Sequence, residues 1–282
     1  GTSVLHLGGH PEKLAKERDL TTEAFLERLE KLSQVVLSAR EKRVRPGRDE
    51  KVLTCWNSLM LSAFVEAYQV TGEKTYLNTA LKGMNFILEN LKEGNRLKRV
   101  WGKTLDGKGL AKLDGYLDDY ACTIQALLDL VSVDAQPRWL NTAIELADSM
   151  LTLFQDDKEG GFYYTASDHE TLIVRPRSHF DGSVPSGTSS AAMSLLRLFH
   201  LTGLERYAKA AQAVLNLYGP NLTRLSDQFA NLLCCLDFSL SKPREVAVVL
   251  PEVPQEEELA PLFQIYKNYS PGKVVAVGRE KE

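Results

Sequence analysis

The chain has 282 residues, enough for one large domain or two, and its 44% hydrophobic and 25% charged residues are typical of a globular protein with a sizeable core. The formal net charge of -3, with Lys and Arg scattered among acids, argues against a nucleic-acid partner. No segment approaches the roughly 20 apolar residues of a membrane span, and the N-terminus lacks a signal-peptide pattern. We therefore expect a soluble, cytoplasmic protein with no membrane association.

Apolar residues at helical spacing predict three helices in the first third of the chain. The first covers 21–43, the second begins at Thr54 and stops at Gly72, and the third covers 73–91. Because only two or three residues join the second helix to the third, the two are expected to run antiparallel as a helical hairpin.

The same hairpin recurs twice. A helix over 116–132 precedes QPRWLNTAIELADSMLTLF, and a helix over 188–201 precedes LERYAKAAQAVLNLY. Each second helix begins with an aromatic residue and carries Ala four residues later: Tyr76 and Ala80, Trp139 and Ala143, Tyr207 and Ala211. This pair of residues occurs three times at the same position in the hairpin, about 65 residues apart, which favours a repeat of stacked hairpins.

Long connections separate the hairpins. Residues 94–109 and 160–187 mix Gly, aromatic and β-branched residues, which predicts short β-hairpins at the rim of a helical barrel. After about Pro243 the pattern predicts a strand, a helix and a strand. The predicted organisation is a helical-hairpin domain over 1–240 and a small α/β element over 241–282 packed on it.

Polar motifs lie where the first helix of each hairpin begins: Trp56-Asn57-Ser58, Asp118 to Ala121, and Pro185 to Thr188. In a ring of hairpins these N-termini converge on one face of the central cavity, which predicts a pocket. Asn, Asp, Ser and Thr are also the residues that cap helices, so simple capping is the competing interpretation.

The pair Asp118-Asp119 exceeds what a single cap needs. Aromatic faces with carboxylates and Arg are typical of sugar-binding cavities, and two carboxyl groups at a suitable distance can carry out glycoside hydrolysis. We therefore predict Asp118 and Asp119 as catalytic acid/base groups. The predicted substrate-binding residues are Trp56, Asn57, Tyr120, Arg175, Arg177, Asp181 and Ser186.

The sequence contains no motif for disulfide, metal, nucleotide or serine-hydrolase chemistry. The four cysteines, Cys55, Cys122, Cys234 and Cys235, form no CxxC pair and are predicted to be free buried thiols. The five histidines show no metal-ligand spacing, and P-loop, dinucleotide-binding and GxSxG patterns are missing. We expect no metal and no cofactor.

Together, RPGRDEKVLTCWNSLM, LDDYA and FDGSVPSGTSSAAMSLLRL resemble a family of conserved hypothetical proteins related to spermatogenesis-associated, thioredoxin-domain proteins. The positions that match the family pattern are Arg43, Arg45, Pro46, Asp49, Lys51, Leu53, Thr54, Trp56, Asn57, Asp118, Asp119, Tyr120, Ala121, Asp181, Pro185, Ser186 and Gly187. The chain departs from the pattern at Ser58, where Gly is usual, and at Thr188, where Asn is usual, so its ligand preference is expected to differ.

The resemblance implies a six-hairpin glycosidase-like (α/α) toroid, mainly α and incomplete here. It also implies that this chain matches the C-terminal part of such proteins, without their thioredoxin-like domain, which makes an upstream thioredoxin-like domain a candidate partner.

Three functions remain open at this point. The first is a pocket that binds or acts on a carbohydrate. The second is a non-catalytic scaffold, which an exposed apolar face of the first helix, including Phe25, Leu29 and Leu32, would favour. The third is a sugar 2-epimerase-like isomerase, whose resemblance implies paired histidines, whereas only His179 lies near a motif.

Overall fold

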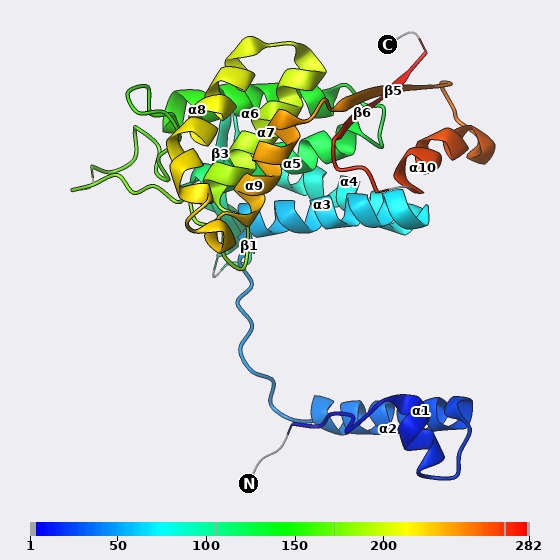
Figure 1. Ribbon diagram of the computed structural model, residues 1–282. Coiled ribbons are helices and arrows are strands. Elements are labelled where there is room, and N and C mark those ends of the chain that lie inside the picture. Colours follow the sequence, from blue (N-terminus) through cyan, green and yellow to red (C-terminus); the bar gives the residue numbers. More distant parts are fainter. Residues whose placement is uncertain (1–3, 105, 172, 268, 281–282) are drawn as a thin grey trace. The chain divides into compact units, whose positions relative to one another are not determined.

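The computed structural model describes residues 4–104, 106–171, 173–267 and 269–280 (Figure 1). Its contacts divide the chain into two compact units, Gly1–Asp49 and Glu50–Glu282. The C-terminal element expected over 241–282 lies inside the second unit, and the boundary near residue 240 stays a prediction.

The first unit consists of two helices, α1 (Pro11–Lys16) and α2 (Thr22–Glu41). The Thr21 hydroxyl caps α2 by accepting a hydrogen bond of 3.2 Å from the Ala24 N–H. Phe25 is the buried residue of α2, and nearly all of its later turns are exposed. The predicted helix over 21–43 is therefore present, with little of its surface covered.

Three helical hairpins build the second unit, as the sequence predicted. They are α3 (Thr54–Thr71) with α4 (Lys74–Asn90), α5 (Leu117–Val131) with α6 (Arg138–Phe154), and α7 (Gly187–Thr202) with α8 (Glu205–Leu222). Gly72 and Gly203 end α3 and α7 in the left-handed conformation, with φ of 74° and 69°. Glycine adopts this conformation without the steric cost that a Cβ brings, which explains why both helices stop there.

The first helices of the hairpins form a row in which α5 packs between α3 and α7, and each then packs against its own hairpin partner (Figure 1). The aromatic residues Trp139 and Tyr207 are fully buried, as are the alanines four residues later, Ala143 and Ala211. Burying a large side chain of this kind contributes about 2 kcal/mol, and the small alanines let the helices approach closely. The repeated pattern is thus the hairpin core.

An antiparallel sheet fills the first long connection. Its strands are β1 (Val52–Leu53), β2 (Lys92–Glu93), β3 (Arg96–Lys103) and β4 (Gly109–Asp114), and β3 pairs with the other three. The register places Val52 opposite Trp101 and Val100 opposite Lys112. Strand β1 leads directly into α3, so the sheet supports the start of that helix.

The second long connection differs from the prediction. Apart from one bridge between Gln155 and Phe162, no strand occurs among its described residues. Its course is fixed instead by single contacts, such as the 2.8 Å hydrogen bond from the Tyr164 N–H to the Pro176 carbonyl. Pro176 and Pro185 have no N–H to give to a ladder, which explains why the expected β-hairpin does not form.

The end of the chain is arranged as strand, helix and strand, as expected. After α9 (Ala230–Leu240) come β5 (Arg244–Leu250), α10 (Ala260–Lys267) and β6 (Lys273–Arg279), with short 3₁₀ turns at Ser226–Gln228 and Glu256–Leu259. Strands β5 and β6 are parallel. They share a small apolar cluster with α10, and β6 also contacts α5 and α7.

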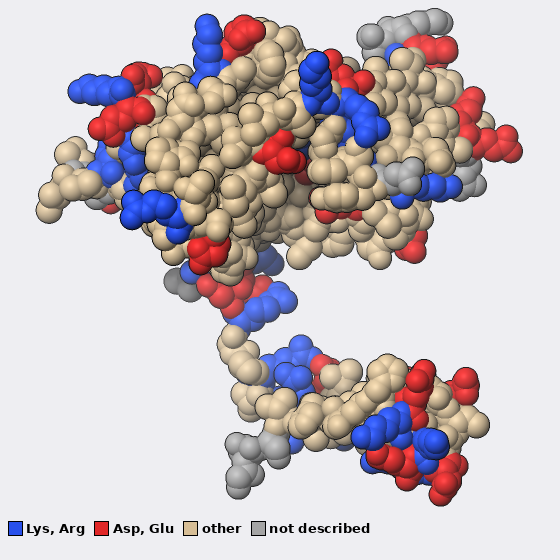
Figure 2. Space-filling view, viewed as in Figure 1, with Lys and Arg blue, Asp and Glu red and all other residues tan. Residues whose placement is uncertain are grey.

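Charged side chains of both signs are scattered over the face shown in Figure 2, with no broad area of one sign among the described residues in that view. No helix within the described part of the chain has both the length and the apolar character needed to cross a bilayer.

Candidate functional site

A pocket of about 330 Å³ lies where the three first helices begin. Cys55 and Trp56 come from the start of α3, Asp118 from the start of α5, and Ser186 and Gly187 from the start of α7. The second long connection supplies the rest of the wall: Tyr164, Pro176, Arg177, Ser178, Phe180, Gly182, Ser183, Val184 and Pro185. The three motifs that the sequence singled out thus meet at one cavity, of a size that suits a small ligand.

Gly187 shows how closely two of these helix starts approach each other. A Cβ atom at this position would lie 3.0 Å from the Asp118 nitrogen and 3.2 Å from its Cα. Side-chain carbon atoms rarely come so near to backbone, and backbone moves less readily than the end of a side chain. The glycine in PSG therefore lets α7 pack directly on the start of α5.

Asp119 is fully buried and ties the starts of α3 and α5 together. Its Oδ1 accepts a hydrogen bond from the Cys55 N–H at 3.0 Å, and its Oδ2 accepts from the Tyr116 N–H at 2.9 Å and from Arg99 Nη1 at 3.0 Å. Burial and the neighbouring Asp118 charge raise the pKa of Asp119 to about 7, and Arg99 and the Tyr116 N–H only partly offset them. Asp119 has no exposed surface and does not line the pocket.

Asp118 faces the pocket instead, with 19% of its side chain exposed. Arg99 Nη1 lies 3.1 Å from its Oδ1, so one guanidinium serves both aspartates. Arg99 also stacks over the Tyr116 ring, 4.9 Å from its centre, and Tyr116 stacks in turn on Tyr164. The result is a carboxylate held beside an aromatic face, the Tyr164 ring of the pocket wall.

Of the aromatic residues predicted to bind a substrate, Trp56 and Tyr120 have different surroundings. Trp56 lines the pocket and is 64% exposed. Tyr120 is buried in the core, where its hydroxyl accepts a 3.0 Å hydrogen bond from the Leu97 N–H. Asn57 does not line the pocket either, because its amide turns back to the Leu53 carbonyl at 2.8 Å. Only Trp56 of these three is placed to stack against a bound ring.

The two arginines of the second connection also differ. Arg175 donates to the Thr165 carbonyl at 2.6 Å and stacks over Tyr163, away from the pocket wall. Arg177 lines the pocket, but its guanidinium is bonded to Asp156 and to the Gly160 carbonyl. Both side chains hold the loop in place, and Arg177 presents part of its surface to the cavity.

Asp181 joins two helix starts rather than facing a ligand. Its Oδ1 accepts from the Ser186 N–H at 2.8 Å and from the Ser189 hydroxyl at 2.6 Å, while its Oδ2 accepts from the Asn231 and Leu232 N–H groups at 2.8 and 3.2 Å. The Ser186 hydroxyl caps α7 by accepting from the Ser189 N–H. Capping, the competing interpretation of these motifs, thus accounts for Asp181 and for much of Ser186.

Sequence reasoning missed Arg99, Tyr164 and Phe180. Arg99 lies on β3, in a basic run whose spacing gives no sign of a partner 19 residues later. Tyr164 follows a double glycine in GGFYYTAS and is one of two adjacent tyrosines. Only the path of the connection decides which of them faces the pocket.

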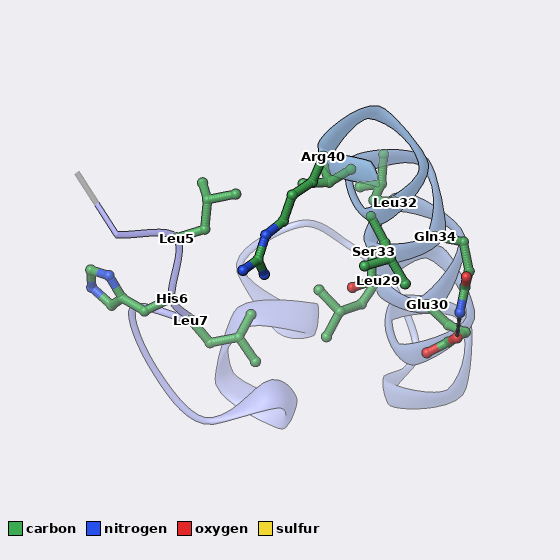
Figure 3. Close-up of a pocket in the computed structure, with 11 residues that line it drawn as sticks. Leu5, His6, Leu7, Leu29, Glu30, Leu32, Ser33, Gln34 and Arg40 are labelled. Carbon is green, nitrogen blue, oxygen red and sulfur yellow. Dashed lines mark hydrogen bonds between the residues drawn. The ribbon is translucent and has the colours of Figure 1, made fainter. Parts of the chain in front are cut away.

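A larger groove of about 680 Å³ lies in the first unit, far from these motifs in sequence. Figure 3 shows Leu5 and Leu7, on the segment before α1, and Leu29 and Leu32, on α2, around this groove, with Arg40 beside them. Leu32 is 55% exposed. The groove is mostly apolar, with Glu30 as the carboxylate among its lining residues, and no Tyr, Trp or Phe lines it, unlike the pocket in the second unit.

Among the residues that the structure describes, no three His, Cys, Asp or Glu side chains are grouped as a metal site. His179 packs against Phe180 and Tyr218 and does not line the pocket. Burial lowers its pKa.

Comparison with known proteins extends these observations. The chain is 28% identical over 283 residues to spermatogenesis-associated protein 20 of Rattus norvegicus, a match that covers 98% of this chain and 36% of that protein. The chain is its homologue. It is also 30% identical over 203 residues to an uncharacterized protein of Caenorhabditis elegans, covering 71% of this chain and 28% of that one. The chain spans about a third of the length of these curated relatives.

No protein-family model matches the chain. Among solved structures, D-mannose isomerase is similar with a TM-score of 0.51 and 18% identity, over 62% of this chain and 46% of that one. Identity at this level shows the fold alone. The fold is mainly α and of the (α/α) toroid type, as the sequence predicted.

Proposed function

We propose that the pocket at the helix starts binds a carbohydrate. The observation that carries this proposal is the placement of Trp56, Tyr164 and Asp118 around one cavity, with contributions from all three hairpins. Aromatic rings can pack against the C–H face of a sugar, and a carboxylate can accept hydrogen bonds from its hydroxyl groups. D-mannose isomerase, which shares the fold, acts on a sugar by its name, and this supports the proposal only by analogy.

Asp118 is the carboxylate that we propose to meet the ligand. Arg99 contacts both of its oxygens and so fixes its orientation, and the part of the side chain that stays exposed lines the cavity. Catalysis by the pair Asp118 and Asp119 stays a prediction. Hydrolysis that uses two carboxyl groups requires both to reach the glycosidic bond, whereas Asp119 has no surface in the pocket. The geometry therefore supports binding more strongly than turnover.

The isomerase alternative has less support. Its chemistry would need histidines at the ligand, and no histidine is among the residues that line the pocket. We do not propose it.

A thermal-unfolding series tests the carbohydrate proposal. A sugar that binds the folded state raises the midpoint, by about 3 °C at ten times its dissociation constant for a chain of this size. We expect one class among a panel of mono- and oligosaccharides to produce this shift in the wild-type chain and not in Asp118→Asn. Asp227→Asn, an exposed aspartate outside the pocket lining, is the matched control and should keep the shift. Absence of any shift across the panel would contradict the proposal.

A second function, interaction through the first unit, is favoured by one observation. Leu32, Val35, Val36 and Leu37 are all exposed on α2, beside the apolar groove. Exposed apolar surface of this kind is typical of a face that another protein covers. We propose that its partner is the further domain of the longer relatives, the thioredoxin-like domain that the family resemblance implies.

The interaction proposal predicts that the chain co-elutes with a separately produced domain. The probe is the part of rat spermatogenesis-associated protein 20 outside the matched region, mixed with this chain in size-exclusion chromatography. We expect a complex that Leu32→Asp weakens at least tenfold, since one buried leucine contributes about 2 kcal/mol. Lys31→Asp, an exposed neighbour, serves as the charge control. Separate elution of the wild-type proteins at micromolar concentration would count against this function.

A further inference from the structure

Two cysteines meet under the pocket. Cys55, the second residue of α3, and Cys122, on α5, have their sulfur atoms 3.4 Å apart, with the Cys55 thiol donating to Cys122. Both are free thiols in this structure, and 67 residues separate them in sequence. A disulfide holds its sulfur atoms about 2.05 Å apart, so a small displacement of two packed helices would join them.

The pocket gives this pair its access to solvent. Cys55 lines the cavity and keeps 4% of its surface exposed, whereas Cys122 keeps 1% and does not line the cavity. The Cys55 N–H is bonded to Asp119, which fixes the start of α3 against α5. A small reagent in the pocket therefore meets Cys55 first and finds Cys122 directly behind it.

We propose that Cys55 and Cys122 are a redox-modification site, which a peroxide converts to a disulfide that ties α3 to α5. The Cys55 sulfur attacks one peroxide oxygen, the O–O bond breaks, and a sulfenic acid and one water form. The Cys122 sulfur then displaces the hydroxyl group, forming the S–S bond and a second water. The two thiols lose two electrons and two protons, and one hydrogen peroxide becomes two waters.

The surroundings also set the rate of this reaction. The Cys122 thiol, burial and the charges of Asp118 and Asp119 raise the pKa of Cys55. The thiolate is the reacting form, so the pair reacts slowly at neutral pH, and its rate should rise about tenfold for each pH unit. Cys234, which is exposed, lies outside this environment and reacts independently.

Peroxide treatment followed by thiol counting tests the proposal. The Cys234→Ser chain, which lacks the exposed thiol, is treated with hydrogen peroxide, quenched with catalase, and unfolded in the presence of an alkylating reagent. We expect one alkylated cysteine rather than three, and a peptide that links residues 55 and 122 and separates on reduction. The same protein with Cys122→Ala should give a trapped sulfenic acid at Cys55 and no link.

Other products would overturn the inference. Retention of all three thiols after exposure at pH 9, or oxidation of Cys55 beyond the sulfenic acid with Cys122 intact, would show that the thiols are in contact but do not act as a pair. The Cys234→Ser result does not depend on whether the Cys122→Ala chain folds, because Cys234→Ser leaves both buried thiols in place. Sugar binding is scored separately, so failure here leaves the carbohydrate proposal untouched.

Discussion

Asp119→Ala is expected to lower the free energy of unfolding by about 3 kcal/mol or more. The variant leaves the N–H groups of Cys55 and Tyr116 buried without their acceptor, and it removes one of the two carboxylates beside Arg99. Urea unfolding followed by circular dichroism measures the change.

Asp118→Ala is the matched control, one residue away on the same helix. Asp118 bonds to Arg99 and is partly exposed, so its loss should cost about 1 kcal/mol or less. Equal losses for both variants would mean that the Asp119 network does not hold the helix starts together.

The same network predicts a pH dependence. The pKa of Asp119 is raised in the folded chain, from an ordinary value of 3.8 to about 7. The folded state therefore binds more protons than the unfolded state between these values, and the contribution of Asp119 to stability falls as pH rises from about 4 to about 7. Asp119→Asn, which cannot ionise, should lack this decline, and parallel pH profiles of the two proteins would contradict the assignment.

The hairpins could be predicted from sequence because their signals are local. The apolar spacing of α3, α5 and α7 and the left-handed glycines at 72 and 203 depend on neighbouring residues alone. The path of residues 160–187 could not be predicted, because it depends on non-local contacts such as the hydrogen bond from the Tyr164 N–H to the Pro176 carbonyl. A segment that is held by isolated hydrogen bonds has no hydrophobic periodicity from which its conformation could be predicted.

The position of the candidate pocket could be predicted from the sequence, but the role of each residue around it could not. The starts of three neighbouring helices bring Trp56, Asp118 and Ser186 to one pocket, as the sequence predicted. Adjacent residues on a helix point about 100° apart, so the two aspartates are expected to have different surroundings. Sequence alone could not tell that Asp119 is the buried one, because the choice depends on Arg99, on a strand outside the helix.

Asp181→Ala should also destabilise the chain strongly, by about 2 to 4 kcal/mol, because one carboxylate caps two helices. Its four hydrogen bonds connect the segment before α7 with the start of α9, through Ser186, Ser189, Asn231 and Leu232.

The Asp181 variant separates a structural role from a ligand role. If Asp181 served only to bind a sugar, Asp181→Ala would unfold at the same urea concentration as Asp227→Ala, an exposed control on the 3₁₀ turn before α9. A lower midpoint with unchanged slope places its contribution in the folded structure instead. Because the capped segment runs through Gly182, Pro185 and Ser186 of the pocket wall, the same loss should weaken any ligand that the wild-type pocket holds. A stable variant with an intact ligand response would show that neither cap matters to the site.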